Sequence, residues 1–138
     1  MEERDIGLLI KRLADKIKIS VDVLLKEQGI TFSQTLVIGF LYSQSGSATQ
    51  KEIEDHLQVS HPTVVGIISR LEKNGFVSCH TDQKDRRNKI VCATDKALNT
   101  VDAMSVGKRQ MEERLTKGLS EEELAEFRRI INIFCENI

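Results

Sequence analysis

The sequence predicts a mainly α-helical protein with one small β-hairpin and a helix-turn-helix near its middle. Two observations carry this prediction: apolar residues recur at helical spacing over most of the 138 residues, and two short β-prone runs lie close together between residues 76 and 93. The hydrophobic content of 40% is enough for a buried core. No apolar run approaches the roughly 18 residues of a membrane span and no apolar leader opens the chain, so we expect a cytoplasmic protein with no membrane partner.

The formal net charge of -1 hides an uneven distribution of charge along the chain. Residues 29–47 carry no charge, whereas residues 60–89 carry six basic and three acidic side chains, and every other stretch is neutral or acidic. Such a pattern is compatible with a local nucleic-acid-binding patch and also with an ordinary solvated face. It excludes a uniformly basic nucleic-acid-binding protein.

The first expected helix covers residues 5–28 and ends at Gly29. Its apolar residues are three or four positions apart and form one stripe: Ile6, Leu9, Ile10, Leu13, Ile17, Val21, Leu24 and Leu25. A second helix begins with a capping box formed by Thr31 and Gln34. It has no charged face, so we expect it in the centre of the core, with the apolar residues Leu36, Val37, Ile38, Phe40 and Leu41.

Two short helices joined by a tight turn follow. Thr49 and Glu52 form a capping box at the start of the first, and Ser60 caps the second, which ends at Gly75. The helical spacing of the apolar residues predicts that the core-facing side chains of this second helix are Val64, Ile67 or Ile68, and Leu71. The residues expected on the opposite face are His61, Thr63, Val65, Ser69 and Arg70. This is the pattern of a helix-turn-helix, whose second helix enters the major groove of DNA, but helical hairpins that only pack share it.

The two β-prone runs, residues 76–80 and 90–93, come directly after these helices. A polar loop joins them, and its tip at residues 84–87 reads Lys-Asp-Arg-Arg. A hairpin directly after a helix-turn-helix is a wing. The basic tip therefore favours DNA binding, and the expected fold is a winged helix-turn-helix.

Two further amphipathic helices are expected after the wing. The first, residues 94–117, carries the apolar residues Leu98, Val101, Met104, Met111 and Leu115. The second opens with a capping box of Ser120 and Glu123, and carries Leu124, Phe127, Ile130, Ile131, Phe134 and Ile138. A small winged-helix lobe has too little surface to cover these stripes, so we expect a second copy of the chain to cover them. Packing of the terminal helices within one chain is the alternative.

These patterns divide the chain into three regions. They are an N-terminal dimerisation helix at residues 1–29, a winged helix-turn-helix DNA-binding region at residues 30–93, and C-terminal dimerisation helices at residues 94–138. The expected fold class is thus mainly α, with a small β-hairpin wing and flanking dimerisation helices.

Few residues of the sequence suggest a catalytic, metal or redox site. The sequence has no nucleophile elbow, phosphate-binding loop or zinc-protease motif, so we expect neither an enzyme nor a cofactor. Cys79, His80 and Cys92 could approach across the hairpin and form a metal or redox site. We favour two small packing thiols and an exposed histidine, because no further ligand pair completes a site. Cys135 is interpreted as filler of the core or of a dimer interface.

Several motifs occur in a fixed order. They are Thr31 with Gln34 at a helix start, Pro-Thr-Val at residues 62–64, Leu-Glu-Lys-Asn-Gly-Phe-Val at residues 71–77, and Asp-x-x-Asp-Arg-Arg at residues 82–87. Together they resemble the MarR family of bacterial transcriptional regulators, and the overall layout is similar to that family's multidrug-efflux repressors. The chain departs from the family pattern at Cys79, where relatives carry an arginine.

Two departures on the recognition helix affect the function that the resemblance implies. Val65 and Gly66 lie where relatives often carry polar side chains, so fewer groups can hydrogen bond to base edges, although Val65 can still touch a thymine methyl. The resemblance implies a homodimeric repressor that binds a pseudo-palindrome in double-stranded DNA and is released by a small aromatic or amphipathic effector. A winged-helix protein–protein adaptor without specific DNA binding is the alternative.

The candidate DNA contacts lie on the second helix and on the wing. Arg87 is expected in the minor groove, held by a charge-assisted hydrogen bond to Asp85. The full set is Ser60, His61, Pro62, Thr63, Val65, Ser69, Arg70, Lys84, Asp85, Arg86, Arg87 and Lys89. The resemblance also implies an effector crevice where the first, second and fifth helices meet, with the candidate lining residues Ile10, Leu13, Ile17, Phe40 and Met104.

Overall fold

The computed structural model describes residues 4–138, so the first three residues of the expected N-terminal region lie outside the described part. The elements follow the expected order, with helix boundaries within a few residues of those expected. They are α1 (Ile6–Leu25), a short 3-10 helix (Lys26–Gln28), α2 (Phe32–Ser43), β1 (Ser47–Thr49), α3 (Gln50–Leu57), α4 (His61–Lys73), β2 (Val77–Thr81), β3 (Lys89–Ala93), α5 (Asp95–Leu115) and α6 (Glu121–Glu136). The predicted class, mainly α with a small hairpin, is confirmed.

The three predicted capping boxes all form, at Thr31, Thr49 and Ser120. In each, the N-cap hydroxyl accepts a hydrogen bond from the backbone N–H three residues on, and the side chain at that position accepts one from the N-cap N–H. These reciprocal bonds satisfy backbone donors that have no partner within the helix. The sequence therefore predicts where these helices start, because hydrogen bonds between residues three positions apart determine the starts.

The sheet has one strand more than the sequence analysis anticipated. Its order is β1-β3-β2, all antiparallel, and Val91 of β3 pairs with Ala48 on one side and Cys79 on the other. Ser45 and Gly46 have positive φ and turn the chain onto β3, where the Ala93 N–H donates to the Gly46 carbonyl at 2.8 Å. A three-residue strand has no periodicity of its own, so only this pairing defines it.

The hydrophobic core lies in a lobe formed by α2, α3, α4 and the sheet, closed by the C-terminal end of α1 and the start of α5. α2 is central, as predicted, and contributes Val37, Ile38 and Leu41, all of them fully buried. Leu36 differs from the expectation, because it lies on the outer side of α2 and is exposed. The uncharged helix is therefore enclosed on most but not all of its circumference.

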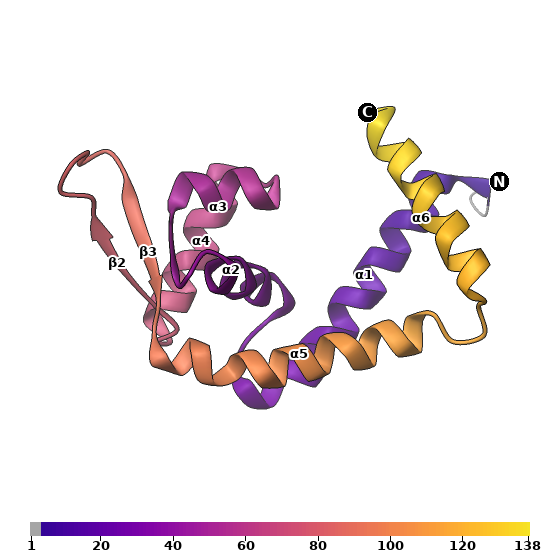
Figure 1. Ribbon diagram of the computed structural model, residues 1–138, viewed down its shortest axis with the longest axis horizontal. Helices are drawn as coiled ribbons and strands as arrows, with labels where there is room; N and C mark the ends of the chain where they lie inside the picture. The colour runs from indigo at the N-terminus through magenta and orange to yellow at the C-terminus, as the bar shows by residue number, and fades with distance from the viewer. Residues whose placement is uncertain (1–3) are drawn as a thin grey trace.

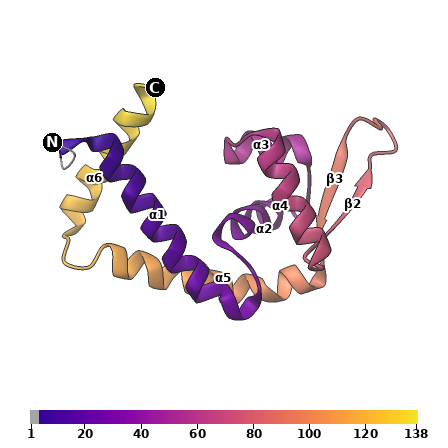
Figure 2. The same cartoon turned by 180° about the vertical axis from the view of Figure 1, so that it is seen from behind.

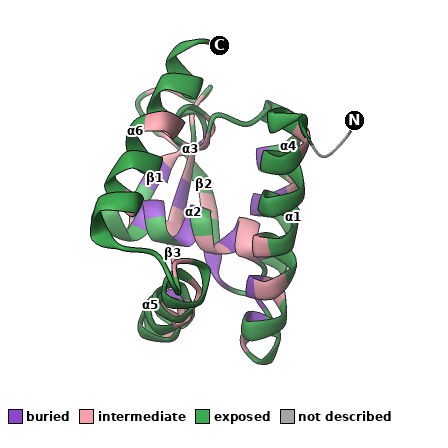
Figure 3. Ribbon diagram, turned by 90° about the vertical axis from the view of Figure 1, so that its right-hand side faces the viewer, coloured by how far each residue is buried: buried purple, intermediate pink, exposed green. Residues whose placement is uncertain are grey.

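The molecule is U-shaped (Figure 1). α5 forms the base of the U and joins the winged-helix lobe to the other limb, here called the arm, where α6 and most of α1 lie (Figure 1 and Figure 2). The two helices of the arm lie apart when the molecule is turned by 90° (Figure 3). α6 contains no buried residue, and α1 buries only Val21 and Leu25 near its C-terminal end (Figure 3). Among residues 4–138, no helix is long and apolar enough to cross a membrane.

Candidate nucleic-acid interface

The two faces of α4 are those the sequence predicted. Val64, Ile67, Ile68 and Leu71 are all buried in the lobe. The exposed residues of the candidate set on this helix are His61, Pro62, Thr63, Val65, Ser69 and Arg70. Their exposure follows from the burial of the opposite face, since the helix has one apolar and one polar side. α4 therefore offers to a partner two hydroxyls, an imidazole, a guanidinium and the partly exposed Val65.

The N-terminal end of α4 is ordered by its cap. The Ser60 Oγ accepts a hydrogen bond from the Thr63 N–H at 3.4 Å and lies 2.8 Å from the Thr63 Oγ1. Both hydroxyls remain exposed at this end of the helix. A helix N-terminus with available hydroxyls and amides suits a phosphate group.

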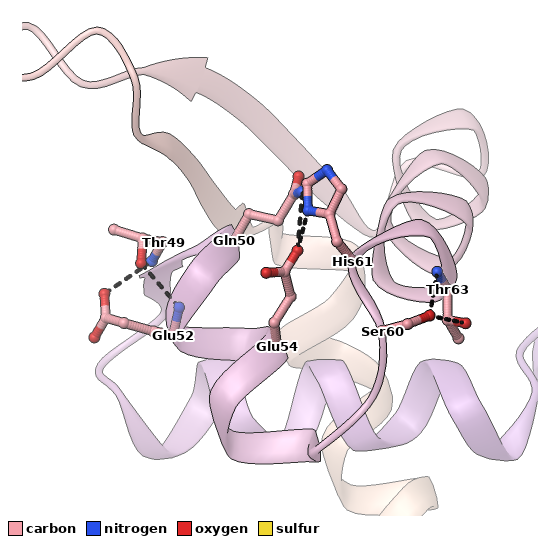
Figure 4. A network of polar contacts seen from close by, with 7 residues as sticks. All are labelled: Thr49, Gln50, Glu52, Glu54, Ser60, His61 and Thr63. Carbon is pink, nitrogen blue, oxygen red and sulfur yellow. Dashed lines mark hydrogen bonds and ion pairs between the residues drawn. The ribbon is translucent and has the colours of Figure 1, made fainter.

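His61, the first residue of α4, is tied to α3 by contacts that the sequence analysis missed (Figure 4). Its Nδ1 contacts the Glu54 Oε1 and lies 3.3 Å from the Gln50 Nε2. The Gln50 Nε2 donates to the same Glu54 oxygen at 3.5 Å. Gln50 and Glu54 are four residues apart, so they share one face of α3, and this spacing was the available signal.

The wing tip is organised by Asp85 and Arg87, and the predicted hydrogen bond between them forms. The Arg87 Nε donates to Asp85 Oδ1 at 3.0 Å, its Nη2 donates to Oδ2 at 3.1 Å, and its backbone N–H donates to Oδ1 at 3.1 Å. These bonds lower the pKa of Asp85 and raise the pKa of Arg87, so both groups stay ionised near neutral pH. The Arg87 side chain is 90% exposed and is nevertheless held in one direction.

The other basic residues of the wing, Lys84, Arg86 and Lys89, are all exposed. The Lys84 N–H donates to Asp82 Oδ1 at 3.0 Å, and the Asp82 N–H donates to the Asn88 carbonyl at 3.0 Å. These hydrogen bonds shape the loop and leave the ammonium and guanidinium groups at its surface. Such groups can neutralise phosphates without fixing a base sequence.

A shallow hollow of about 450 Å³ adjoins α4 on the side of α1. It is lined by Lys18, Asp22, Thr31, Ser33, Gln34, Pro62, Thr63, Gly66, Ile67 and Arg70. The Asp22 carboxylate is occupied there, because its Oδ1 accepts a hydrogen bond from the Phe32 N–H at 2.6 Å. A second open hollow, of about 580 Å³, lies on the wing.

None of the five candidate effector residues lines either hollow. Ile10 and Leu13 are exposed on the arm, while Ile17 and Met104 are half-buried against the core. Phe40 is buried, and its ring stacks on the His56 ring of α3 with centroids 4.2 Å apart. The structure thus brings Ile17 and Met104 to the edge of the core and turns Phe40 into the lobe.

The cysteines and His80 do not form a metal site. Among the described residues, no group of three or more His, Cys, Asp or Glu side chains is placed to hold an ion. Cys79 and Cys92 are half-buried on β2 and β3, and the exposed His80 places its Nδ1 4.0 Å from the Cys92 Sγ. Burial, assisted by a hydrogen bond to Glu72, raises the pKa of the Cys79 thiol to about 11. Cys135 is exposed on α6, so it does not fill the core of the single chain, and the alternative, a place in a dimer interface, stays a prediction.

Comparisons with known proteins agree with this geometry. Residues 28–88 match the model of the MarR family. The HTH-type transcriptional regulator YwoH of Bacillus subtilis is 34% identical over 91 residues, and the match spans 66% of this chain and 66% of YwoH, about two thirds of its length. The HTH-type transcriptional repressor MdtR of the same organism is 28% identical, with 87% of this chain and 77% of MdtR covered. Among solved structures, the MepR–DNA complex of S. aureus superposes with a TM-score of 0.90 at 27% identity, covering 97% of this chain and 98% of MepR.

The raised pKa of Cys79 predicts an unreactive thiol. At about pH 8, iodoacetamide should modify Cys79 in the folded protein much more slowly than in the urea-unfolded chain, because the thiolate is the nucleophile. Peptide mass spectrometry measures both rates, and the folded rate should increase as the pH approaches 11. The pKa of Cys79 in the folded protein exceeds the ordinary value of 9.0. The contribution of this thiol to the free energy of unfolding is therefore fully present below pH 9.0 and is lost as the pH rises through the folded pKa. Equal rates in the two states at about pH 8 would contradict the assignment.

Proposed function

This chain belongs to the MarR family of transcriptional regulators, and from that premise we propose that it represses transcription by binding duplex DNA as a homodimer. The observation that carries the proposal is the pairing of two DNA-reading elements on one lobe. The exposed face of α4 and the arginine at the wing tip belong to neighbouring elements, since β2 packs against α4. Major-groove and minor-groove contacts by one small lobe require such a pair.

We assign α4 to the major groove. Its exposed face carries few groups that can hydrogen bond to bases, since Val65 and Gly66 occupy its middle. Val65, 39% exposed, suits a thymine methyl, and the hydroxyls at the helix start suit phosphates or base edges. Sequence preference then depends substantially on the shape and flexibility of the DNA as well as on direct contacts.

We assign the wing to the adjacent minor groove. Arg87 projects into solvent while Asp85 fixes the plane of its guanidinium, and narrow minor grooves attract arginine through their negative potential. Lys84, Arg86 and Lys89 are positioned to contact the flanking phosphates. Pre-ordering of Arg87 lowers the entropy that DNA binding would otherwise cost.

The arm suits a twofold dimer. Ile6, Leu9 and Leu13 of α1 and Phe127 and Ile133 of α6 are all exposed in the single chain. Exposed apolar side chains in such number mark an interface, and identical chains most often associate about a twofold axis. The two α4 helices of such a dimer would reach successive major grooves about 34–36 Å apart.

We further propose that a small aromatic or amphipathic effector binds where α1 and α5 meet, beside the half-buried Ile17 and Met104. This junction links the arm to the lobe, so a ligand there can favour one spacing of the two DNA-reading lobes over another. A tenfold loss of DNA affinity requires about 1.4 kcal/mol of differential binding, which a few apolar contacts supply.

Arg87→Ala should weaken binding to the selected operator by roughly tenfold or more and relax base preference at the flanks of the site. The operator is the duplex that the wild-type protein selects from a random-sequence pool, and fluorescence anisotropy measures the affinity. Arg129→Ala is the matched control, because Arg129 also pairs with a carboxylate, that of Glu126, but lies on α6. An unchanged footprint and affinity in Arg87→Ala would contradict the wing assignment. Failure of the wild type to bind any duplex would favour a protein–protein adaptor.

Phe134→Glu combined with Ile131→Glu should convert the dimer to a monomer and abolish tight operator binding at the same time, because charges would enter the apolar surface of α6. Light scattering and anisotropy report the two effects. Arg128→Glu introduces the same side chain at an exposed charged position of the helix and should leave both properties unchanged. A wild-type protein that scatters as a single chain would sink the dimer proposal.

Effector binding should be reciprocal: a compound that weakens operator binding by some factor must itself bind more weakly, by the same factor, when the operator is present. Titration calorimetry with benzoate and with tetraphenylphosphonium, each with and without the selected duplex, measures both sides of the cycle. Met104→Ala should reduce compound affinity while operator affinity in the absence of compound stays the same. Binding of a compound without any effect on DNA affinity would indicate a repressor controlled by its abundance.

A further inference from the structure

The cluster of His61, Glu54 and Gln50 determines which nitrogen of the imidazole faces outward. Glu54 Oε1 is an acceptor, and two donors converge on it, the Gln50 Nε2 and the His61 Nδ1. A carboxylate accepts hydrogen bonds, so Nδ1 carries the proton of the neutral ring. The other nitrogen, Nε2, points away from Glu54 (Figure 4). In neutral His61 this outward nitrogen is an acceptor, and in protonated His61 it is a cationic donor.

The three residues of this cluster differ in how far they are buried. Gln50 is 9% exposed and the Glu54 side chain 17% exposed, whereas the His61 side chain is 67% exposed. The two inner residues lie on α3 and are held within the lobe, and the ring projects from the first turn of α4. Glu54 therefore positions a group that can contact a partner and has little exposed surface with which to make such a contact itself.

The electrostatic surroundings of the ring are simple. α2 and β1 contain no charged residue, and apart from His61 itself the first turn of α4 contains neither an acid nor a base. Tyr42 is the titratable residue of α2. On α3, Lys51 and Asp55 lie one position, about 100°, further round the helix from Gln50 and Glu54. The titratable groups of β2 are Cys79 and His80, and His80 faces Cys92 across the hairpin. Glu54 is thus the carboxylate that faces His61 among the described residues.

This arrangement has a consequence for DNA binding at the start of α4. When the imidazole is neutral, the Glu54 carboxylate leaves one uncompensated negative charge at the helix end that we assign to the DNA, and phosphates are repelled. When the imidazole is protonated, its charge cancels that of Glu54, and Nε2–H can donate to an acceptor on the DNA. The phosphates therefore favour the protonated form of the ring.

We propose that His61 is a proton-linked DNA contact with Glu54 as its positioning residue, so that DNA binding takes up a proton at Nε2, which donates to a phosphate oxygen or to N7 or O6 of guanine. This inference rests on the proposed DNA-binding function. It assigns to one residue of the recognition helix a dependence on pH, since histidine changes charge between about pH 5 and 8.

The test measures affinity for the selected duplex between about pH 6 and 8 at constant ionic strength. Wild-type affinity should fall as the pH rises, by up to about tenfold per pH unit for each histidine that takes up one proton. Calorimetry of DNA binding in buffers of different ionisation enthalpy should show that the wild-type protein takes up protons. This measurement does not depend on any variant. His61→Gln should flatten the pH profile and abolish the proton uptake.

The chain has three histidines, so the other two provide matched controls. His56→Gln and His80→Gln should keep the wild-type pH profile. A profile flattened by either of these, or a wild-type profile equal to that of His61→Gln, would overturn the inference. Circular dichroism shows that each variant is folded before its affinity is measured.

Glu54→Gln tests the positioning role, because glutamine keeps the shape and one acceptor oxygen but removes the charge. The midpoint of the pH profile should change, because a neutral amide replaces the carboxylate that contacts the imidazole. An unchanged midpoint would show that Glu54 has only a structural role.

A second comparison identifies the acceptor on the DNA. Weakened binding of His61→Gln to random-sequence DNA as well as to the selected duplex would assign a phosphate contact, and a loss confined to the selected duplex would assign guanine.

The outcomes also separate this inference from the proposed function. Wild-type binding that is tight but independent of pH would overturn the role of His61 and leave DNA binding intact. No binding to any duplex between about pH 6 and 8 would overturn both.

Discussion

The enclosure of α2 is the constraint on which the rest of the lobe depends. This helix has no charged residue, so its apolar side chains must be covered, and α4, α3, the sheet and the ends of α1 and α5 cover them. Once Ile68 and Leu71 of α4 pack into this core, the opposite face of α4 must lie at the surface. The position of the wing follows as well, because β3 is bonded to the chain leaving α2 through the Gly46 carbonyl and β1.

In the arm, by contrast, the apolar side chains are mostly not covered by the rest of the chain. α6 has a well-defined apolar stripe but buries none of its residues, and only the end of α1 enters the core. The same hydrophobic effect that closes the lobe therefore leaves the arm incomplete in one chain. α5 spans both environments: Ala97 at its start is fully buried, while Leu115 at its end is exposed. In the proposed dimer a second chain covers the arm, and α5 connects that interface to the lobe that we propose binds DNA.

Carboxylates act as positioning groups at both proposed DNA-reading elements. Asp85 orders the guanidinium of Arg87 through bonds between residues two positions apart, entirely within the wing tip. Glu54 orders the ring of His61 across the turn between α3 and α4. In each case an acceptor fixes a donor that projects into solvent, at the cost of a negative charge near the proposed path of the phosphates. The two sites differ in that the partner of Asp85 is a permanent cation, whereas that of Glu54 can gain or lose its charge.

The sequence by itself determined the features that depend on local chemistry. Three capping boxes, the two faces of α4, the wing hairpin and the Asp85–Arg87 pair were all predicted, because each involves residues a few positions apart or a regular period. Tertiary structure alone decided β1, the outward placement of Leu36 and the packing of Phe40 on His56. It also decided the bond from Glu54 to His61, which joins two helices through a left-handed turn at Gln58. These features depend on which surfaces meet after the helices pack, and a one-dimensional pattern does not contain that information.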